Sequence, residues 1–136
     1  MSNYKKYGDI IKETTTDGPD GSGGNKNSNV IEITTQNDKL QLIQNNDFVI
    51  VDVYGKDCQP CRTIAPQFEK LSRQNGNAGV VVFAKEDYMH KISTDIRGVP
   101  TFQYFYKGKM IHPTTVGADI PEAARRIEEL KAMAHV

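Results

Sequence analysis

The feature that most constrains the fold is a run of seven residues near the middle of the chain. Phe48–Tyr54 is apolar at every position except Asp52, and Gly55 ends the run. A nearly continuous apolar run of this length is typical of a strand that is covered on both faces. A charged residue inside such a strand is costly to bury, so Asp52 is expected to serve a function or to face polar groups.

Further strands are predicted on both sides of this run from β-branched, apolar and turn residues. They lie at 30–34, 80–84, 101–106 and 109–116, and Lys107–Gly108 forms a hairpin turn between the last two. The strands alternate with helical patterns along the chain. This order predicts an α/β fold with a central mixed sheet and helices on both faces.

Four helices are predicted from apolar spacing and from capping residues. The first is a short helix that carries Leu40, Leu42 and Ile43 after a cap at Asn37 or Asp38, and the second spans 61–75, where Pro66 should kink it. A short third helix runs from Asp87 to about Thr94. The last helix has the buried stripe Ala123, Ile127, Leu130 and Ala134. At the start of the last helix, Asp119 as cap, Pro121 at the first helical position and Glu122 predict a capping box.

The first 29 residues differ in composition from the rest of the chain. They hold five of the eleven glycines, and residues 14–29 contain no hydrophobic side chain. Such a segment cannot bury enough apolar surface to offset its ordering entropy. We therefore expect a flexible Gly/Asn/Ser-rich segment at 1–29, of which only Tyr4–Ile11 could dock, and one folded domain at 30–136.

Charge and apolar patterning exclude several classes of protein. Seventeen basic and seventeen acidic residues give zero net charge, which argues against a nucleic-acid partner. No apolar run reaches the roughly 18 residues that a membrane span needs. The first residues lack the pattern of a secretory signal, so a reducing, cytoplasmic location is expected. Abundant Asn, Lys and Ile also fit the AT-rich genome of a large DNA virus, which could package such a protein.

The chemistry of the chain begins at Cys58-Gln59-Pro60-Cys61, between the buried strand and the start of a helix. Unpaired backbone N–H groups and the helix dipole at this position stabilise a thiolate on Cys58. The two-residue spacing lets the sulfurs meet in a small ring. The Cys58 thiolate can then attack a disulfide, and Cys61 can resolve the mixed disulfide that results.

Two other interpretations of the cysteine pair stay open. The pair could be half of a zinc site completed by His90, His112 or His135, although no two of these histidines have the close spacing that zinc sites use. The cysteines could also be two unreactive buried residues that happen to be so spaced.

Three segments together resemble the thioredoxin family. Residues 51–66 look like its active-site region, 96–102 like its cis-proline loop, and 116–118 like the glycine turn before its last helix. They follow the family's order at about its spacing, and the resemblance covers about residues 30–134. It implies a thioredoxin-like three-layer fold and reduction of disulfides in protein substrates. It also implies recycling by a reductase, with no cofactor, metal, nucleic acid or membrane involved.

The resemblance implies a role for each matching residue. Cys58 matches the attacking cysteine and Cys61 the resolving one. Asp52 matches the buried carboxylate that accepts the proton of the resolving thiol, with a purely structural aspartate as the alternative. Pro100 matches the cis-proline, which would present the Val99 backbone to an extended substrate segment; an ordinary trans loop proline is the alternative.

The residues between and after these positions complete the implied substrate surface. Gln59 and Pro60 lie between the cysteines, and Gly117 matches a glycine of the substrate groove, unless it is a plain turn glycine. Because Pro60 stands where strongly oxidising relatives have histidine, we expect a reducing potential, near about −270 mV.

The chain also departs from the family pattern. The family usually has Trp before the first cysteine, where this chain has Asp57. Asp57 either caps the helix or faces partners, and Lys56 and Arg62 are expected to offset part of its charge. An ungapped alignment places Val81 where a lysine often accompanies the buried carboxylate. These departures keep an alternative function open, a thioredoxin-fold interaction or structural module with little turnover.

Overall fold

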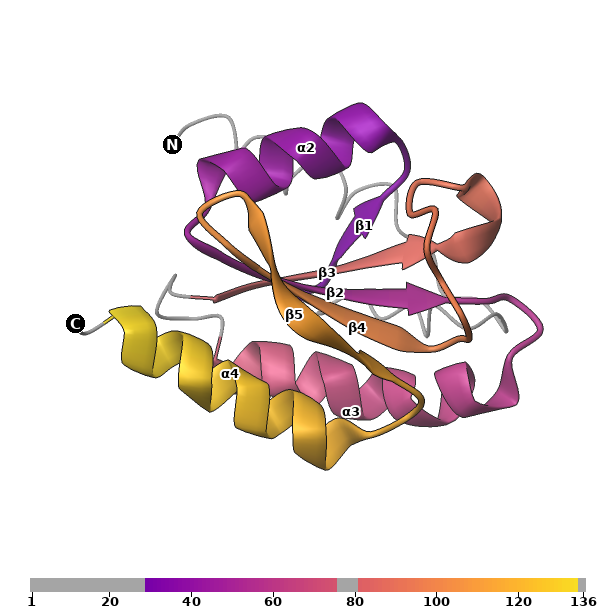
Figure 1. Ribbon diagram of the computed structural model, residues 1–136. Coiled ribbons are helices and arrows are strands. Elements are labelled where there is room, and N and C mark those ends of the chain that lie inside the picture. The colour runs from indigo at the N-terminus through magenta and orange to yellow at the C-terminus, as the bar shows by residue number, and fades with distance from the viewer. Residues whose placement is uncertain (1–28, 76–80, 135–136) are drawn as a thin grey trace.

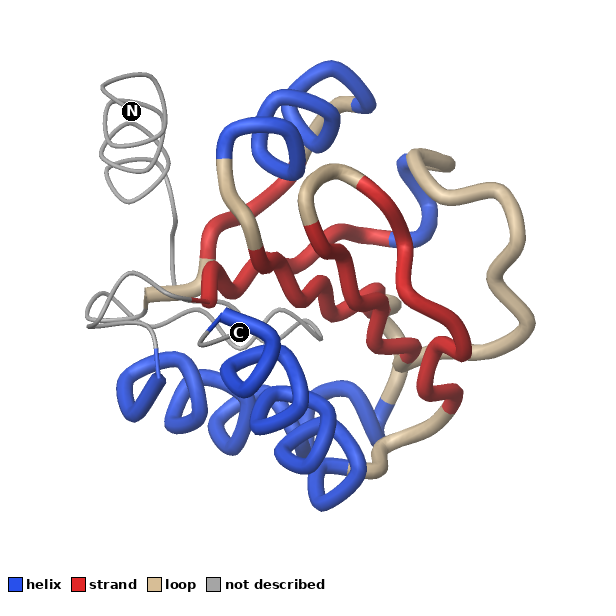
Figure 2. The backbone as a smooth tube through the Cα atoms, turned by 60° about the vertical axis from the view of Figure 1, so that its left-hand side comes forward, coloured by secondary structure: helices blue, strands red, loops and turns tan. Residues whose placement is uncertain are grey.

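The computed structural model describes residues 29–75 and 81–134 and shows three layers (Figure 1). A mixed sheet lies in the middle. Helix α2 (Gln36–Asn45) covers one face, and helices α3 (Gln59–Asn75) and α4 (Ile120–Ala134) cover the other. A second view shows the same separation of α2 from the α3–α4 pair across the strands (Figure 2). The predicted α/β class with helices on both faces is confirmed.

Five strands form the sheet in the order β1-β3-β2-β4-β5. They are β1 (Ile31–Ile33), β2 (Phe48–Tyr54), β3 (Val81–Asp87), β4 (Thr101–Tyr106) and β5 (Lys109–Val116). β3 pairs in parallel with β1 and with β2, whereas β4 is antiparallel to β2 and β5 is antiparallel to β4. β2 is the central strand and all seven of its residues are buried, as its apolar run predicts.

The alternation of side chains along β2 divides the core between the two faces of the sheet. Val49, Val51 and Val53 pack in the cluster beside α2. Phe48 and Ile50 pack in the other cluster, with apolar side chains of α3 and α4. Asp52 continues the second row, and it therefore lies on the face that α3 covers.

The first two helices begin earlier than predicted. The N-cap of α2 is Thr35, whose Oγ1 accepts a hydrogen bond from the backbone N–H of Asp38 at 3.0 Å, so the expected cap at Asn37 or Asp38 is wrong. Helix α3 begins at Gln59 rather than at residue 61, and it continues across Pro66. The cysteine motif is therefore itself the first turn of α3.

A single 3₁₀ turn, η1 (Tyr88–His90), replaces the short helix expected to reach Thr94. Asp87 caps it as predicted, because its side chain accepts a hydrogen bond from the Met89 N–H at 2.9 Å. The turn ends because Lys91 adopts a left-handed conformation with φ 56°.

The last helix keeps its predicted cap but not the full capping box. Asp119 Oδ1 accepts a hydrogen bond from the Glu122 N–H at 3.0 Å. The helix starts at Ile120, so Pro121 is its second residue. The Glu122 carboxylate accepts hydrogen bonds from Arg125, a charged donor on the next turn of the helix, at 2.9 and 2.8 Å. Of the predicted stripe, Ala123, Ile127 and Leu130 are buried, and the Ala134 side chain is outside the described residues.

Strand β3 is longer than the sequence indicates. Prediction ended it at Ala84, but Lys85, Glu86 and Asp87 continue the strand and are buried. Partners from distant segments compensate these charges; for example, Glu86 Oε1 lies 2.6 Å from Lys39 Nζ. The charged end of β3 thus becomes part of the core.

The division of the chain at residue 29 stays a prediction, because residues 1–28 lie outside the described residues. The described helices include none with the length and apolar character to cross a membrane.

Candidate active site

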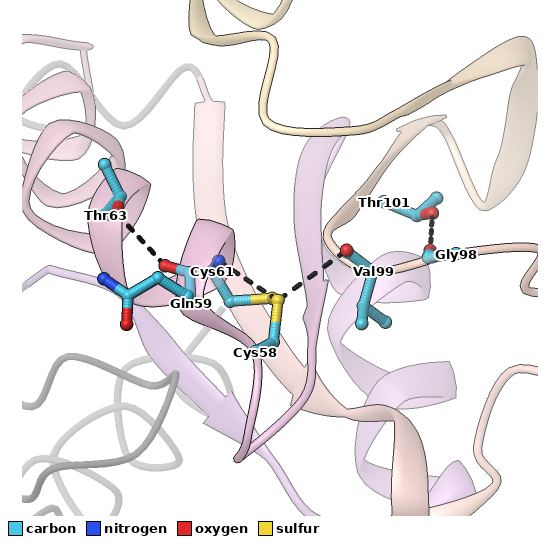
Figure 3. The surroundings of a disulfide bond; sticks show 7 residues. All are labelled: Cys58, Gln59, Cys61, Thr63, Gly98, Val99 and Thr101. Carbon is cyan, nitrogen blue, oxygen red and sulfur yellow. Dashed lines mark hydrogen bonds between the residues drawn. A yellow bond between two sulfur atoms is a disulfide. The ribbon is translucent and has the colours of Figure 1, made fainter.

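Cys58 and Cys61 form a disulfide at the start of α3, with their Cα atoms 5.2 Å apart (Figure 3). The Cys58 carbonyl accepts a hydrogen bond from the Arg62 N–H at 3.2 Å, so Cys58 occupies the N-cap position. The Cys61 N–H lies 3.1 Å from Cys58 Sγ and donates to it. In the reduced protein this donor and the helix dipole stabilise a thiolate on Cys58.

The two cysteines differ in exposure. Cys61 is 0% exposed, whereas Cys58 is only partly buried. A partner disulfide can therefore reach the Cys58 sulfur but not the Cys61 sulfur. This difference is what the sequential roles of attacking and resolving thiol require.

The loop before β4 lies directly against the disulfide. Cys58 Sγ is 3.6 Å from the Val99 carbonyl oxygen, and the Val99–Pro100 peptide bond is cis. The Gly117 N–H donates a hydrogen bond to the Pro100 carbonyl at 2.8 Å. Gly117 has φ +106°, a conformation that favours glycine. The structure thus brings together the three segments that sequence analysis singled out.

The remaining predicted residues surround the first turn of α3. Gln59 and Pro60 are exposed at that turn, and Arg62 is half-buried. Asp57 is exposed and precedes the helix, and the cap position is held by Cys58 instead. Lys56 Nζ points toward Asp87 of β3, with 4.0 Å between Nζ and Oδ2. The expected influence of Lys56, Asp57 and Arg62 on Cys58 stays a prediction.

Asp52, the carboxylate predicted for this site, lies buried in β2. It is 2% exposed, and within the described part of the chain its Oδ1 has no hydrogen-bond partner. Burial raises the pKa of Asp52 to about 7; nearby Lys85 opposes this rise and Glu32 adds to it. A carboxylate with a pKa near neutrality can both accept and release a proton under ordinary conditions.

Sequence analysis missed the partners of Asp52. Lys85 of β3 lies directly opposite Asp52 of β2 on one side and Glu32 of β1 on the other. Lys85 Nζ is 3.8 Å from Glu32 Oε1, and the Tyr54 hydroxyl donates a hydrogen bond to Glu32 Oε2 at 2.9 Å. The expectation that Val81 replaces the family's lysine is therefore wrong, because Lys85 fills that role. The pairing of β3 with β2 identifies Lys85 as the lysine beside Asp52, and an ungapped alignment does not reveal this pairing.

Among residues 29–75 and 81–134, no three His, Cys, Asp or Glu side chains form a group that could hold a metal ion. Both cysteines are joined to each other in this structure. His135, one of the zinc ligands considered from the sequence, lies outside the described residues.

The chain is similar to known proteins along most of its length. The family model described as Thioredoxin matches residues 29–130. A thioredoxin-like protein of Fusarium culmorum is 37% identical over 82 residues, which are 57% of this chain and 68% of that protein. Thioredoxin-3 of Dictyostelium discoideum is 36% identical over 85 residues, or 62% of this chain and 81% of the relative.

Solved structures agree with these relatives. A thioredoxin of Plasmodium falciparum superposes with a TM-score of 0.66 at 29% identity, covering 72% of this chain and 96% of the other. A thioredoxin of Malassezia sympodialis gives a TM-score of 0.65 at 31% identity, covering 72% and 89%. With the Cys58–Cys61 disulfide at the start of α3, these similarities establish thiol–disulfide oxidoreductase activity, and the chain belongs to the thioredoxin family.

Proposed function

We propose that this protein reduces disulfide bonds in protein substrates, with Cys58 as the attacking thiol and Cys61 as the resolving thiol. The unequal surroundings of the two sulfurs carry the proposal. Cys58 Sγ caps a helix, 3.1 Å from the Cys61 N–H, on the accessible side of the pair. Cys61 is completely buried beneath it. Only Cys58 is both activated and reachable.

The first step is attack by the Cys58 thiolate on a substrate disulfide. A bond forms between Cys58 and one substrate sulfur, and the substrate S–S bond breaks. The second substrate sulfur leaves as a thiolate and takes a proton from water. We expect the extended substrate segment to lie along the Val99 backbone, because the Val99 carbonyl is 3.6 Å from Cys58 Sγ.

The second step is resolution by Cys61. Its thiol loses a proton, and the resulting thiolate attacks Cys58 Sγ, which releases the reduced substrate and leaves the Cys58–Cys61 disulfide. We propose that Asp52 accepts this proton, because its pKa of about 7 makes it a base of suitable strength near neutral pH. Lys85 and Glu32 adjust that strength in opposite directions.

A full cycle needs two electrons from outside the protein. We propose a partner reductase that returns the Cys58–Cys61 disulfide to the dithiol, and a reducing, cytosol-like compartment as the place of work. We expect the potential of the pair to be near about −270 mV because Pro60 holds the second position between the cysteines. A dithiol at that potential can donate electrons to most protein disulfides that are not strongly protected.

Insulin reduction driven by dithiothreitol tests the proposal, combined with a redox titration of the cysteine pair. The wild-type chain should accelerate insulin reduction, and Cys58→Ser should abolish the acceleration. The titration should give a potential close to that of thioredoxins. A folded wild-type dithiol that leaves the insulin rate unchanged would support the interaction module instead.

A further inference from the structure

A pocket of about 570 Å³ opens beside Cys58. Its lining comes from three places: the loop after β2, the end of β3 with η1, and the loop that carries Val99. These segments meet closely, since a Cβ added to Gly55 would lie 3.3 Å from Val99 Cγ2 and 3.9 Å from Tyr88 Cδ2. The reacting sulfur therefore belongs to the wall of a site large enough for a bulky side chain.

The outer wall of the pocket is apolar and exposed. Tyr88 is 45% exposed and Met89 62%, and both line the pocket next to the reactive cysteine. Large apolar side chains left in contact with water beside a reacting group gain free energy when a partner covers them. Met89 adds a thioether, which makes favourable contacts with aromatic rings.

The backbone that carries this wall is also fixed in place before any partner arrives. Asp87 accepts a hydrogen bond from the Met89 N–H at 2.9 Å, and the Lys91 N–H donates to the Tyr88 carbonyl at 3.1 Å. Both ends of the single turn η1 are thus hydrogen-bonded. A preformed wall reduces the entropy that binding must overcome.

The polar groups of the pocket favour an occupant that donates hydrogen bonds. Asp57 contributes an exposed carboxylate and His90 an exposed imidazole. The Asp87 carboxylate is 1% exposed and is occupied by the Met89 N–H and by Lys56, whose Nζ is 4.0 Å from Oδ2. Apolar walls with the Asp57 carboxylate at the rim suit an aromatic side chain that carries an N–H or O–H group. Because Cys58 forms part of the wall, the occupant belongs to the molecule whose disulfide is attacked.

We propose that this pocket is a specificity site that takes a tryptophan or tyrosine side chain of the protein substrate, within two residues of the cysteine that Cys58 attacks. The inference rests on the proposed function. It gives the exposed pair Tyr88 and Met89 a function, and it places Asp57 at the rim of the substrate pocket.

The test uses the reduced full-length protein and short peptides whose single cysteine carries a thionitrobenzoate group. Attack by Cys58 forms a mixed disulfide with the peptide and releases coloured thionitrobenzoate, so the rate reports peptide recognition. Each peptide carries Trp, Tyr, Leu or Ala at one of the two positions on either side of its cysteine. We expect Trp or Tyr at one position to raise the second-order rate constant at least about tenfold over Ala, with Leu in between.

Substitutions of pocket residues test whether the pocket causes the preference for Trp or Tyr peptides. Met89→Ala and Tyr88→Ala should bring the Trp-to-Ala rate ratio close to one. Asp57→Trp should also lower this ratio, because its indole competes for the same pocket. The matched control is Met133→Ala, which removes a methionine of 38% exposure on α4 and should keep the ratio of the wild type.

The outcomes separate the two proposals. Equal rates for all peptides, with Cys58-dependent release intact, would overturn the specificity site and leave the reductase standing. No Cys58-dependent release from any peptide or from free dithiobis(nitrobenzoate) would overturn both. Selectivity that appears only after Tyr4 and Tyr7 are changed to Ala would assign the pocket to the chain's own N-terminal segment and contradict a substrate site.

Discussion

Two buried clusters of charge lie on opposite faces of the same sheet and differ in how fully their charges are compensated. The α2-side cluster consists of Lys39, Glu86, Ser93 and Gln103. The cysteine-side cluster consists of Asp52, Lys85, Glu32 and Tyr54. Lys85 and Glu86 are neighbours in β3, so their side chains point to opposite faces and supply one member to each cluster.

The α2-side cluster is densely connected, and its Glu86 Oε1, which has no hydrogen bond within the described ranges of the chain, lies in a close ion pair with Lys39. Lys39 Nζ lies 2.6 Å from Glu86 Oε1 and donates hydrogen bonds to Gln103 Oε1 at 2.7 Å and to Ser93 Oγ at 2.9 Å. The Ser93 hydroxyl in turn donates to Glu86 Oε2 at 2.6 Å. This network ties α2 to the sheet and holds the charged groups of Lys39 and Glu86 in fixed positions.

The cysteine-side cluster is looser. Lys85 Nζ is 3.8 Å from Glu32 Oε1, and Asp52 Oδ1 has no hydrogen-bond partner among the described residues. The pKa of Asp52 is about 7 as a result of its burial. The difference shows how strand β3 can take part both in a structural ion pair, through Glu86, and in the surroundings of a carboxyl group that exchanges a proton, through Lys85. Because the negative charge of Asp52 is only partly compensated, its pKa lies near neutrality and the group can exchange a proton.

The largest effect is expected from Glu86→Gln. Removing the charge leaves Lys39, whose side chain is only 12% exposed, without its ionic partner, which should lower the free energy of unfolding by about 3–5 kcal/mol. Urea denaturation measures this loss. Glu128→Gln, which breaks an exposed ion pair with Lys131, is the control and should cost at most about 1 kcal/mol. Equal losses in the two variants would show that the α2-side cluster is not structural.

Asp52→Asn should have the opposite effect on stability. The pKa of Asp52 is about 7 in the folded state and 3.8 when unperturbed, so the folded state holds this proton more tightly. The resulting stabilisation is present below about pH 4 and is lost as the pH rises through 7. Above pH 7 the oxidised variant should exceed the wild type by roughly 2–4 kcal/mol, with a smaller difference at pH 4. A variant no more stable than the wild type at pH 8 would contradict the raised pKa.

A smaller effect should distinguish the two neighbours of Asp52. Lys85 lowers the pKa of Asp52 and Glu32 raises it. Lys85→Met should therefore move the pH profile of mixed-disulfide resolution to higher pH, and Glu32→Gln should move it to lower pH. Stopped-flow resolution rates between pH 5 and 9 measure both. If the two profiles moved in the same direction, the cysteine-side cluster would not tune Asp52 as described.

The central strands and the cysteine motif could be read from the sequence because their signals are local. The apolar run at 48–54 and the turn at Lys107–Gly108 each specify structure within a few residues. The resemblance placed Pro100 and Gly117, which the fold brings to the loop beside Cys58, and Asp52, which the fold buries in β2.

The missed partners of buried and pocket residues depend on contacts between distant segments. Lys85 and Glu86 look like the solvated end of a strand until Glu32 and Lys39 lie beside them. Tyr88 has no periodic pattern that would mark it as a pocket wall.

The most direct test of the mechanism is trapping of mixed disulfides with single-cysteine variants. Cys58 is the reachable sulfur and Cys61 is buried, so Cys61→Ser should accumulate a covalent complex with an insulin disulfide, whereas Cys58→Ser should accumulate none. Non-reducing electrophoresis and mass spectrometry identify the complex. Trapping by Cys58→Ser, or equal trapping by both variants, would contradict the assignment of Cys58 as the attacking thiol.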